Sequence, residues 1–270
     1  MDNRPIGVFD SGFGGLTVAR ALIDLLPDED LVYLGDTGRY PYGSRPLSQV
    51  KNFANQITQW LIDNHNVKMV VVACNTASAA ALDDLQSKFE LPIIGVIDPG
   101  IRATKRATRN KKVGVIGTVG TISSQAYQKA VLDQRLGMDL VACPCPGLVE
   151  FVERGETSGQ DIYDLVEKLL LPIKQGGVDT LLLGCTHYPF LARVISDVVG
   201  RDVVLVSSAD ETAFEVRSIL DETGLNTHSN KEAKVKFFSS GDPQWFAKLG
   251  SQLLGLEIAD VGTVEWGSQY

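Results

Sequence analysis

Short apolar runs alternate with longer amphipathic stretches in the first part of the chain. The apolar runs lie at 6–9, 31–34, 69–73 and 92–97. Each is rich in Val, Ile, Leu or Met and has the length of a buried strand. The stretches that carry apolar residues at helical spacing lie at 16–26, 46–64 and 76–89. Strands and helices that alternate in this way predict a parallel sheet with helices on both faces.

The same order of elements starts again near residue 113. Strands are predicted at 113–116, 139–142, 181–184 and 203–206, with helices between them. The distance along the chain from Asp10 to Cys74 nearly equals that from Gly117 to Cys185, the corresponding points of the two passes. We interpret this as an internal duplication. It predicts an α/β fold of two similar, doubly wound domains with mostly parallel sheets, related by pseudo-two-fold symmetry.

Beyond residue 208 the chain adds elements that have no counterpart in the duplication. They are a helix from Ala209, a strand at 235–238, a helix opened by Asp242 and Pro243, and a strand at 261–266. We expect this tail to return to the first unit. The predicted domains are 1–98 plus 208–270, and 99–207, with a ligand cleft between them.

The composition and charge of the chain argue against several classes of binding partner. A formal net charge of -8 disfavours nucleic acids and anionic membranes, because phosphate groups require clustered Lys and Arg. The one basic run, 102–112, is interleaved with Ala and Thr, and we expect it to form a solvated helix face. The start of the chain does not resemble a signal peptide, and no apolar run approaches membrane-spanning length. Since 4 cysteines do not make a disulfide framework, we expect a cytoplasmic protein with free thiols.

Two of the cysteines end nearly identical segments. Residues 67–76 are VKMVVVACNT and residues 178–187 are VDTLLLGCTH, so Cys74 and Cys185 each lie at the C-terminal tip of a predicted strand. Open α/β sheets bind ligands just beyond these tips. Both positions lie where a strand meets a helix, whose N–H groups would favour a thiolate. Either cysteine alone could be a small core residue, but their matched positions favour a paired acid/base device.

Other polar residues occupy the same strand tips. His187 follows Cys185 by two residues and could tune the proton affinity of that thiol. Asp10 and Ser11 follow the first strand, and the glycines after them permit close approach of the backbone to a ligand. The alternative for Asp10 and Ser11 is a helix-capping turn.

Two other kinds of site fit the sequence less well. A dinucleotide site would use Asp36 as ribose ligand, but the first turn lacks the third glycine of G-x-G-x-x-G, and Asp10 would repel a pyrophosphate. A Walker P-loop is absent. A metal site is not expected, because no CxxC or HxxxH spacing occurs, and we interpret Cys143 and Cys145 as structural.

Five motifs resemble those of one family. They are 10–17 (DSGFGGLT), 41–43 (PYG), 73–77 (ACNTA), 184–189 (GCTHYP) and 238–243 (FSSGDP). In this order, and over essentially the whole chain, they are similar to glutamate racemase. Aspartate racemase, a looser relative, shares the fold and the paired cysteines but matches these strings less well.

The resemblance implies a cofactor-independent isomerase that interconverts L- and D-glutamate. It also implies a cytoplasmic homodimer whose D-glutamate feeds peptidoglycan biosynthesis, and hence cell-wall biogenesis and cell shape. The partner it implies is the small-molecule substrate, with no metal, nucleic acid or membrane.

The resemblance also assigns the site residues by motif. Cys74 and Cys185 become the two acid/base residues, with Asp10, Glu153 and His187 as auxiliary ionisable groups. The match around 145–153 is weaker, and Glu150 is the alternative to Glu153. The implied substrate-binding residues are Asp10, Ser11, Pro41, Tyr42, Gly43, Asn75, Thr76, Thr118, Thr121, Thr186 and His187.

The residue types suit this reaction by their own chemistry. Racemisation removes a proton from one face of Cα and delivers another to the opposite face, which two thiols from two similar units can do. Hydroxyl, amide and backbone N–H donors can stabilise charge that develops on the adjacent carboxylate. The motifs contain no Lys for a pyridoxal Schiff base. The alternatives are a racemase of another acidic amino acid, such as aspartate, and a non-enzymatic binding protein for an acidic metabolite.

The two halves match in their thiols but not in the partners of those thiols. Asp10 corresponds to Gly117, and Asn75 corresponds to Thr186. We therefore expect a carboxylate near Cys74, an imidazole near Cys185, and unequal kinetics for the two directions of proton transfer.

Overall fold

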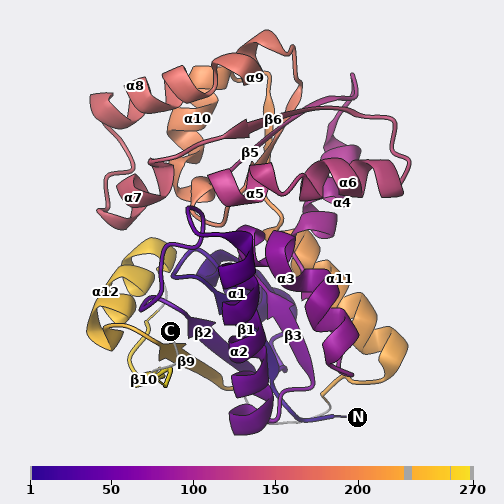
Figure 1. Cartoon of the computed structure of the whole chain (residues 1–270), viewed down its shortest axis with the longest axis vertical. Coiled ribbons are helices and arrows are strands. Elements are labelled where there is room, and N and C mark those ends of the chain that lie inside the picture. The colour runs from indigo at the N-terminus through magenta and orange to yellow at the C-terminus, as the bar shows by residue number, and fades with distance from the viewer. Residues whose placement is uncertain (1, 228–232, 256, 268–270) are drawn as a thin grey trace.

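Two α/β lobes are stacked on each other along the long axis of the molecule (Figure 1). The computed structural model describes residues 2–227, 233–255 and 257–267. We call the part built on the sheet that contains β1 the first lobe and the part built on the sheet that contains β5 the second lobe. Within the described residues, no helix is both long and apolar enough to cross a membrane.

Both lobes are built on parallel sheets with the same central strand order. The first sheet has the order β10-β9-β2-β1-β3-β4 and the second β6-β5-β7-β8. The strands of the first are β1 (Ile6–Asp10), β2 (Leu31–Gly35), β3 (Met69–Val72), β4 (Ile93–Gly95), β9 (Val235–Ser239) and β10 (Val261–Thr263). Those of the second are β5 (Lys112–Gly117), β6 (Asp139–Pro144), β7 (Thr180–Gly184) and β8 (Val204–Val206). In the described part of the chain, all eight strand pairings are parallel. The orders β2-β1-β3-β4 and β6-β5-β7-β8 correspond element by element, so the predicted two-domain, mostly parallel α/β fold is confirmed.

Helices cover both faces of the first sheet. They are α1 (Leu16–Leu25), α2 (Leu47–His65), α3 (Asn75–Lys88), α11 (Ala209–Thr223) and α12 (Pro243–Leu254). One core cluster joins α1, α11 and α12 to the sheet, and another joins α2 and α3 to its other face. Alternation along β1 follows from this arrangement, because Val8 belongs to the first cluster and Phe9 to the second.

The second sheet is covered in the same way by shorter helices. They are α4 (Ile97–Ala107), α5 (Val119–Ser123), α6 (Ala126–Asp133), α7 (Leu148–Glu153), α8 (Gln160–Leu169), α9 (Leu171–Gln175), the 3₁₀ helix η1 (Tyr188–Leu191) and α10 (Ala192–Val199). One cluster packs α7, α8 and α10 on one face, and another packs α4 and α6 on the opposite face.

The C-terminal part of the chain pairs with the first sheet. Strand β9 pairs with β2, β10 pairs with β9, and α11 packs against α1. The domain boundaries at 98/99 and 207/208 stay a prediction, and the first of them falls within α4.

Three expectations about local structure were wrong in detail. The strand expected at 92–97 ends at Gly95, since the chain enters α4 at Ile97. The strand expected at 261–266 ends at Thr263. The basic run does not form one solvated helix face: α4 ends at Ala107, so the run continues through a loop into β5.

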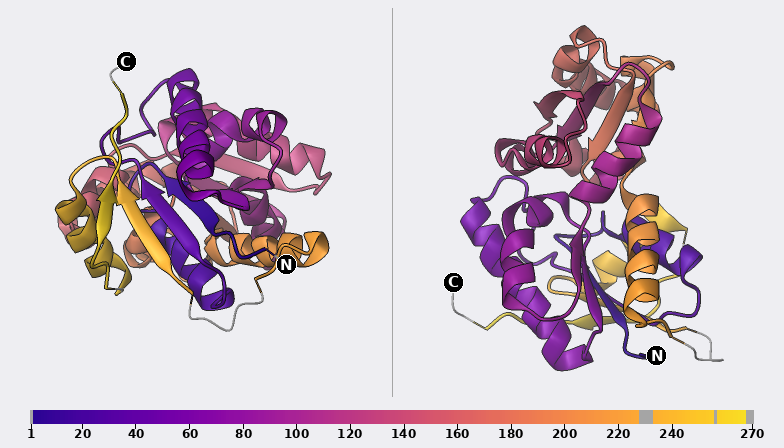
Figure 2. Two further views of the ribbon diagram at one scale, coloured as in Figure 1. Left: turned by 90° about the horizontal axis from the view of Figure 1, so that it is seen from below. Right: turned by 90° about the vertical axis from the view of Figure 1, so that its right-hand side faces the viewer.

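Two arginines of the basic run form ion pairs with α11. Arg102 Nη2 donates to Glu215 Oε2 at 2.5 Å, and Arg106 Nη1 donates to Glu211 Oε1 at 3.0 Å. Helices α4 and α11 lie at the junction of the lobes (Figure 2), so these pairs join segments on either side of it.

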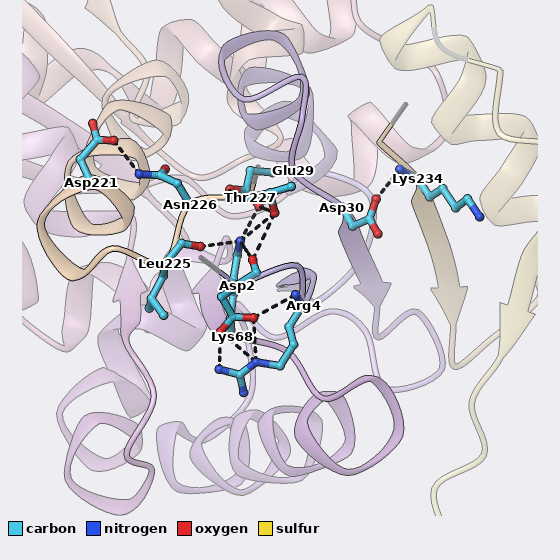
Figure 3. A network of polar contacts seen from close by, with 10 residues as sticks. All are labelled: Asp2, Arg4, Glu29, Asp30, Lys68, Asp221, Leu225, Asn226, Thr227 and Lys234. Carbon is cyan, nitrogen blue, oxygen red and sulfur yellow. Dashed lines mark hydrogen bonds and ion pairs between the residues drawn. The ribbon is translucent and has the colours of Figure 1, made fainter. Parts of the chain in front are cut away.

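A buried lysine, Lys68, connects several segments at the end of the first sheet opposite the strand tips that carry Cys74 (Figure 3). Lys68 precedes β3, and its Nζ donates to Glu29 Oε2 at 2.5 Å, to the Asp2 carbonyl at 2.7 Å and to the Leu225 carbonyl at 2.8 Å. Glu29 also accepts from the backbone N–H of Thr227 at 2.8 Å. A buried charge is stable only when it is paired and hydrogen-bonded in this way.

Candidate active site

The C-terminal tips of strands from both sheets surround one cavity of about 80 Å³. Both sulfurs belong to it: Cys74 follows β3 in the first lobe, and Cys185 follows β7 in the second. The lining residues are Ser11, Tyr40, Pro41, Tyr42, Gly43, Ser44, Cys74, Asn75, Thr76, Thr118, Val119, Cys145, Pro146, Gly147, Val149, Glu150, Cys185, Thr186 and His187. Most of the residues expected from the sequence are therefore at one place, whereas Asp10, Thr121 and Glu153 lie outside the lining.

The Cys74 thiol is enclosed at the N-terminus of α3. Its Sγ accepts from the Ala77 N–H at 3.5 Å and lies 3.8 Å from Ser11 Oγ. Burial and the nearby negative charge of Asp10 raise the pKa of the Cys74 thiol, although the Ala77 N–H and the Ser11 hydroxyl oppose this. The Ala77 N–H at the helix N-terminus favours the thiolate as expected, but desolvation outweighs this single backbone donor. The surroundings of Cys74 therefore favour the protonated thiol.

The Cys185 sulfur has a different environment. No α-helix begins next to it, since the four-residue η1 intervenes before α10, so the expected helix N-terminus is absent at this sulfur. Instead, His187 Nδ1 lies 3.9 Å from Cys185 Sγ. The cationic form of this imidazole can donate to the sulfur.

His187 is buried and lies between Cys185 and a carboxylate. Its Nε2 is 3.3 Å from Glu153 Oε1, an ion-pair contact. Burial lowers the pKa of His187, but the contacts with Cys185 and Glu153 outweigh burial and raise that pKa to about 10. The imidazolium is therefore the prevailing form at neutral pH.

The two candidate glutamates of the α7 segment lie in different places. Glu153, at the end of α7, contacts His187, and its side chain is only 12% exposed. Glu150 is exposed and lines the cavity. The geometry therefore favours Glu153 over Glu150 as the carboxylate that acts on His187.

Asn75 reaches across the lobe boundary. Its Nδ2 donates to Tyr127 Oη at 2.7 Å, while its Oδ1 is buried and has no hydrogen-bond partner. Tyr127, on α6, packs against Gly184, where an added Cβ would lie 3.1 Å from the phenol oxygen. The phenol thus connects the residue after Cys74 with the residue before Cys185.

Three threonine hydroxyls form a closed ring between the lobes. Thr76 Oγ1 lies 2.9 Å from Thr118 Oγ1 and 3.1 Å from Thr121 Oγ1, and the last two are 3.0 Å apart. Each hydroxyl has one proton, so the ring can satisfy all three. A carboxylate that accepts a hydrogen bond from Thr76 or Thr118 must open this ring, and the buried Thr121 is not part of the cavity lining.

The glycine-rich turn after β1 packs directly on the second lobe. A Cβ added at Gly14 would lie 2.3 Å from Thr186 Oγ1 and 2.5 Å from His187 Nδ1, so no side chain fits there. Asp10 is fully buried, and its Oδ2 accepts from the Gly12 N–H at 3.0 Å. The turn thus serves close approach as well as local capping.

Buried polar atoms without a partner gather around the cavity. Among the described residues, the atoms of this kind at the site are Asp10 Oδ1, Tyr40 Oη and Asn75 Oδ1, while Glu153 Oε1 and His187 Nε2 have only their contact with each other. Buried polar groups are normally hydrogen-bonded. Their concentration here marks the cavity as a site that a polar ligand completes.

The segment 40–44 closes the cavity on one side. The Gly43 carbonyl accepts from the Gly120 N–H at 2.8 Å, and a Cβ at Gly43 would lie 2.6 Å from the Thr118 Cβ. Pro41 lines the cavity beside it. The Tyr42 hydroxyl is bonded to Asp36 and is not available to a ligand. Asp36 is fully buried, which excludes the ribose-binding alternative.

Sequence reasoning missed several residues at the site. Tyr40 and Cys145 line the cavity, and Tyr127 binds Asn75. Cys143 and Cys145 both belong to a core cluster, as expected of structural residues, but Cys145 also lines the cavity. Cys143 Sγ contacts the Leu169 carbonyl at 3.0 Å. The position of Cys145 just past the tip of β6 was a usable signal. Tyr127 gave none, since helix α6 approaches the site only through the tertiary fold.

Comparison with known proteins identifies the family. A family model described as Asp/Glu/Hydantoin racemase matches residues 12–215. The chain belongs to this racemase family. Within it, the glutamate racemase of Acidothermus cellulolyticus is 47% identical over 265 residues, covering 98% of this chain and 100% of that protein.

Solved structures of the family agree over the whole chain. The glutamate racemase isoform RacE1 from Bacillus anthracis superposes with a TM-score of 0.93 at 41% identity, covering 98% of each chain. The glutamate racemase from Francisella tularensis in complex with D-glutamate gives a TM-score of 0.92 at 33% identity, covering 99% of this chain and 100% of that one. The chain is thus an amino-acid racemase, an isomerase of the glutamate racemase type, rather than a non-enzymatic binding protein.

Proposed function

We propose that the chain interconverts L- and D-glutamate by a two-base mechanism without a cofactor. The observation that carries the proposal is that two sulfurs, one from each lobe, share one cavity with opposite electrostatic surroundings. Cys74 faces the carboxylate of Asp10, and Cys185 faces the imidazolium of His187. A thiol and a thiolate are the pair that the reaction needs.

Each cysteine acts as the base for one enantiomer and as the acid for the other. For one enantiomer, Cys185 Sγ removes the Cα proton, and Cys74 delivers its own proton to the opposite face of the planar intermediate. The product then leaves a thiolate at Cys74 and a thiol at Cys185. The reverse reaction uses the same steps in the opposite order. The unequal surroundings of the two sulfurs support unequal kinetics for the two directions.

Glutamate fits the buried polar atoms at the cavity that have no partner within the described residues. Asp10 Oδ1 and Asn75 Oδ1 are acceptors suited to an ammonium group. The threonine hydroxyls and backbone N–H groups near them are donors suited to a carboxylate, whose charge increases when Cα loses its proton. Ser11, Thr186 and segment 41–43 complete the proposed binding set. The complex of the Francisella tularensis relative with D-glutamate supports this choice of substrate.

The thiols, the imidazolium and the hydroxyl donors account for both proton transfers without a bound group, which supports cofactor independence. The resemblance to glutamate racemases supports a cytoplasmic homodimer that supplies D-glutamate for peptidoglycan.

The test is exchange of the Cα proton in heavy water. Wild-type protein, dialysed exhaustively against a chelator, is incubated with D-glutamate, L-glutamate, D-aspartate or L-aspartate. We expect deuterium at Cα of both glutamates, with circular dichroism decaying to zero, and much slower exchange of aspartate. Exchange that required added metal or pyridoxal phosphate would contradict cofactor independence. Faster turnover of aspartate would contradict the assigned substrate.

A further inference from the structure

Asp36 forms a buried centre of hydrogen bonds beside the active site. It follows β2, and its side chain is completely buried. Its two oxygens accept from four side chains: Arg39 Nε at 2.7 Å, Ser240 Oγ at 2.5 Å, Trp266 Nε1 at 2.8 Å and the Tyr42 hydroxyl. A carboxylate has about four lone-pair positions for hydrogen bonds, so the capacity of Asp36 is used.

These four donors come from two distant parts of the chain. Arg39 and Tyr42 belong to the segment that continues into the cavity wall at 40–44. Ser240 and Trp266 belong to the C-terminal part that follows β9 and β10. The carboxylate therefore fastens the cavity wall to the C-terminal part of the chain.

A second set of contacts strengthens this connection. Thr37 Oγ1 lies 2.7 Å from Ser239 Oγ, and the Gly38 N–H donates to Ser240 Oγ at 3.0 Å. The Gly241 N–H donates to Thr37 Oγ1 at 3.1 Å. A Cβ at Gly38 would lie 2.4 Å from the Ser240 carbonyl oxygen, so the two segments are in direct backbone contact.

Trp266 contributes an aromatic surface as well as a donor. The Arg39 guanidinium lies 4.2 Å from the Trp266 ring centroid and 4.1 Å from that of Phe53. It is held between these rings while it neutralises Asp36. Partly desolvated cation–π contacts of this kind are stronger than exposed ones.

We propose that Trp266 and Asp36 are positioning residues for the substrate-binding wall at 40–44. The described part of the C-terminal segment contributes no residue to the cavity lining, and it orders this wall through Asp36 before substrate binds. The proposal rests on the proposed function of the cavity and adds to it a determinant of substrate affinity. Tyr42 acts in this arrangement through its backbone, because its hydroxyl is committed to Asp36.

The expected effect on KM and kcat follows from which elements hold the substrate-binding wall and which hold the two sulfurs. The two sulfurs are fixed on β3 and β7, not on the 40–44 segment. If the 40–44 segment is less ordered in the free protein, it must become ordered when substrate binds, and this weakens the net binding free energy. A loss of this kind raises KM while leaving kcat unchanged.

The test uses Trp266→Phe, which keeps a ring over Arg39 but removes the N–H, together with Trp266→Ala and Ser240→Ala. We expect KM for both enantiomers to rise by about threefold to tenfold in Trp266→Phe and by more in Trp266→Ala, since hydrogen bonds to charged groups are among the stronger ones. Calorimetric Kd for D-glutamate should rise by the same factor. The kcat values should stay within about twofold of wild type.

The matched control is Trp60→Phe, which changes an indole that contacts Phe238 and His65 rather than Asp36. Unchanged KM and Kd in all three variants would overturn the proposal, as would an equal rise in Trp60→Phe. A lower melting temperature with unchanged KM would assign Trp266 a purely structural role. Wild-type binding of D-glutamate without racemisation would refute the proposed function, while the Kd series would still test the positioning role.

Discussion

The imidazole of His187 contacts Glu153 and not Glu150: the Nε2 to Oε1 distance is 3.3 Å. On its other side the same ring faces Cys185 Sγ, 3.9 Å from Nδ1. His187 therefore lies between Glu153 and Cys185 and contacts both. A carboxylate that holds an imidazolium next to a sulfur acts on proton transfer without touching the substrate.

Replacing Glu153 with Gln should move the pH dependence of racemisation. Removing the carboxylate charge lowers the pKa of His187, which now stands near 10. The alkaline limb of kcat/KM against pH should move to lower pH by about one pH unit, because a neighbouring opposite charge typically contributes that much or more. Glu150→Gln is the matched control and should leave this limb in place. A shift in Glu150→Gln alone would reverse the assignment.

Each cysteine should be indispensable. Cys74→Ala and Cys185→Ala remove one of the two proton carriers, so we expect racemisation to fall by at least about a thousandfold in each, within the range of about 10²–10⁴ that loss of one acid/base group typically causes. The melting temperature should change little, because both side chains are small and border a cavity. Cys143→Ala is the control, since that thiol contacts the Leu169 carbonyl in the core. Full turnover by either active-site variant would refute the two-base mechanism.

Removing the Tyr127 hydroxyl should weaken substrate binding. In Tyr127→Phe the Asn75 amide loses its partner at 2.7 Å, so its orientation is no longer fixed. We expect KM to rise by about threefold to tenfold, the equivalent of one side-chain hydrogen bond. Tyr163→Phe, a half-buried tyrosine of α8 on the far side of the second lobe, is the control and should behave as wild type. Equal KM values for the two variants would remove Tyr127 from the site.

Gly14 should not tolerate even a methyl group. A Cβ there would lie 2.3 Å from Thr186 Oγ1, inside van der Waals contact, and would displace His187 or force the lobes apart. We predict that Gly14→Ala loses most activity, by about a hundredfold, the cost typical of a misplacement near 1 Å. Gly267→Ala, where an added Cβ meets nothing within 4 Å, is the control. Retained activity in Gly14→Ala would show that the lobes are looser than this contact requires.

The His187 pairing should also make stability depend on pH. Its pKa is raised from 6.5 to about 10, so the stabilisation is fully present below pH 6.5 and is lost as pH rises through 10. The difference in free energy of unfolding between wild type and His187→Gln should shrink over this interval, as measured by urea denaturation. A difference that stayed constant with pH would contradict the raised pKa.

Local patterns in the sequence determined most of the fold. The alternation of apolar runs and amphipathic stretches located the strands and helices, because burial on both faces of a parallel sheet leaves continuous apolar runs. The repeated order then located the duplication and the matched tips of β3 and β7. Errors were confined to element ends, such as Ile97 and 264–266, where neighbouring elements decide where a strand ends.

The electrostatic state of the site could not be found this way. Both thiols were expected to be activated by helix N-termini. Instead, burial beside Asp10 raises the pKa of the Cys74 thiol, and an imidazole, that of His187, lies next to Cys185 in place of a helix N-terminus. Desolvation depends on how many atoms of other segments surround a group, and a single segment of sequence carries no record of that.

Which residues lie at the strand tips could be inferred from the amino-acid pattern alone. From this it followed that two thiols, an imidazole and several hydroxyls could share a site. The three-dimensional structure was needed to distinguish Glu153 from Glu150. It was also needed to show that Tyr127 binds Asn75 and that Trp266 binds Asp36. The difference lies in how far apart along the chain the interacting residues are. Strand and helix patterns are set by neighbours along the chain, whereas these contacts join segments whose approach is fixed by the packing of two lobes.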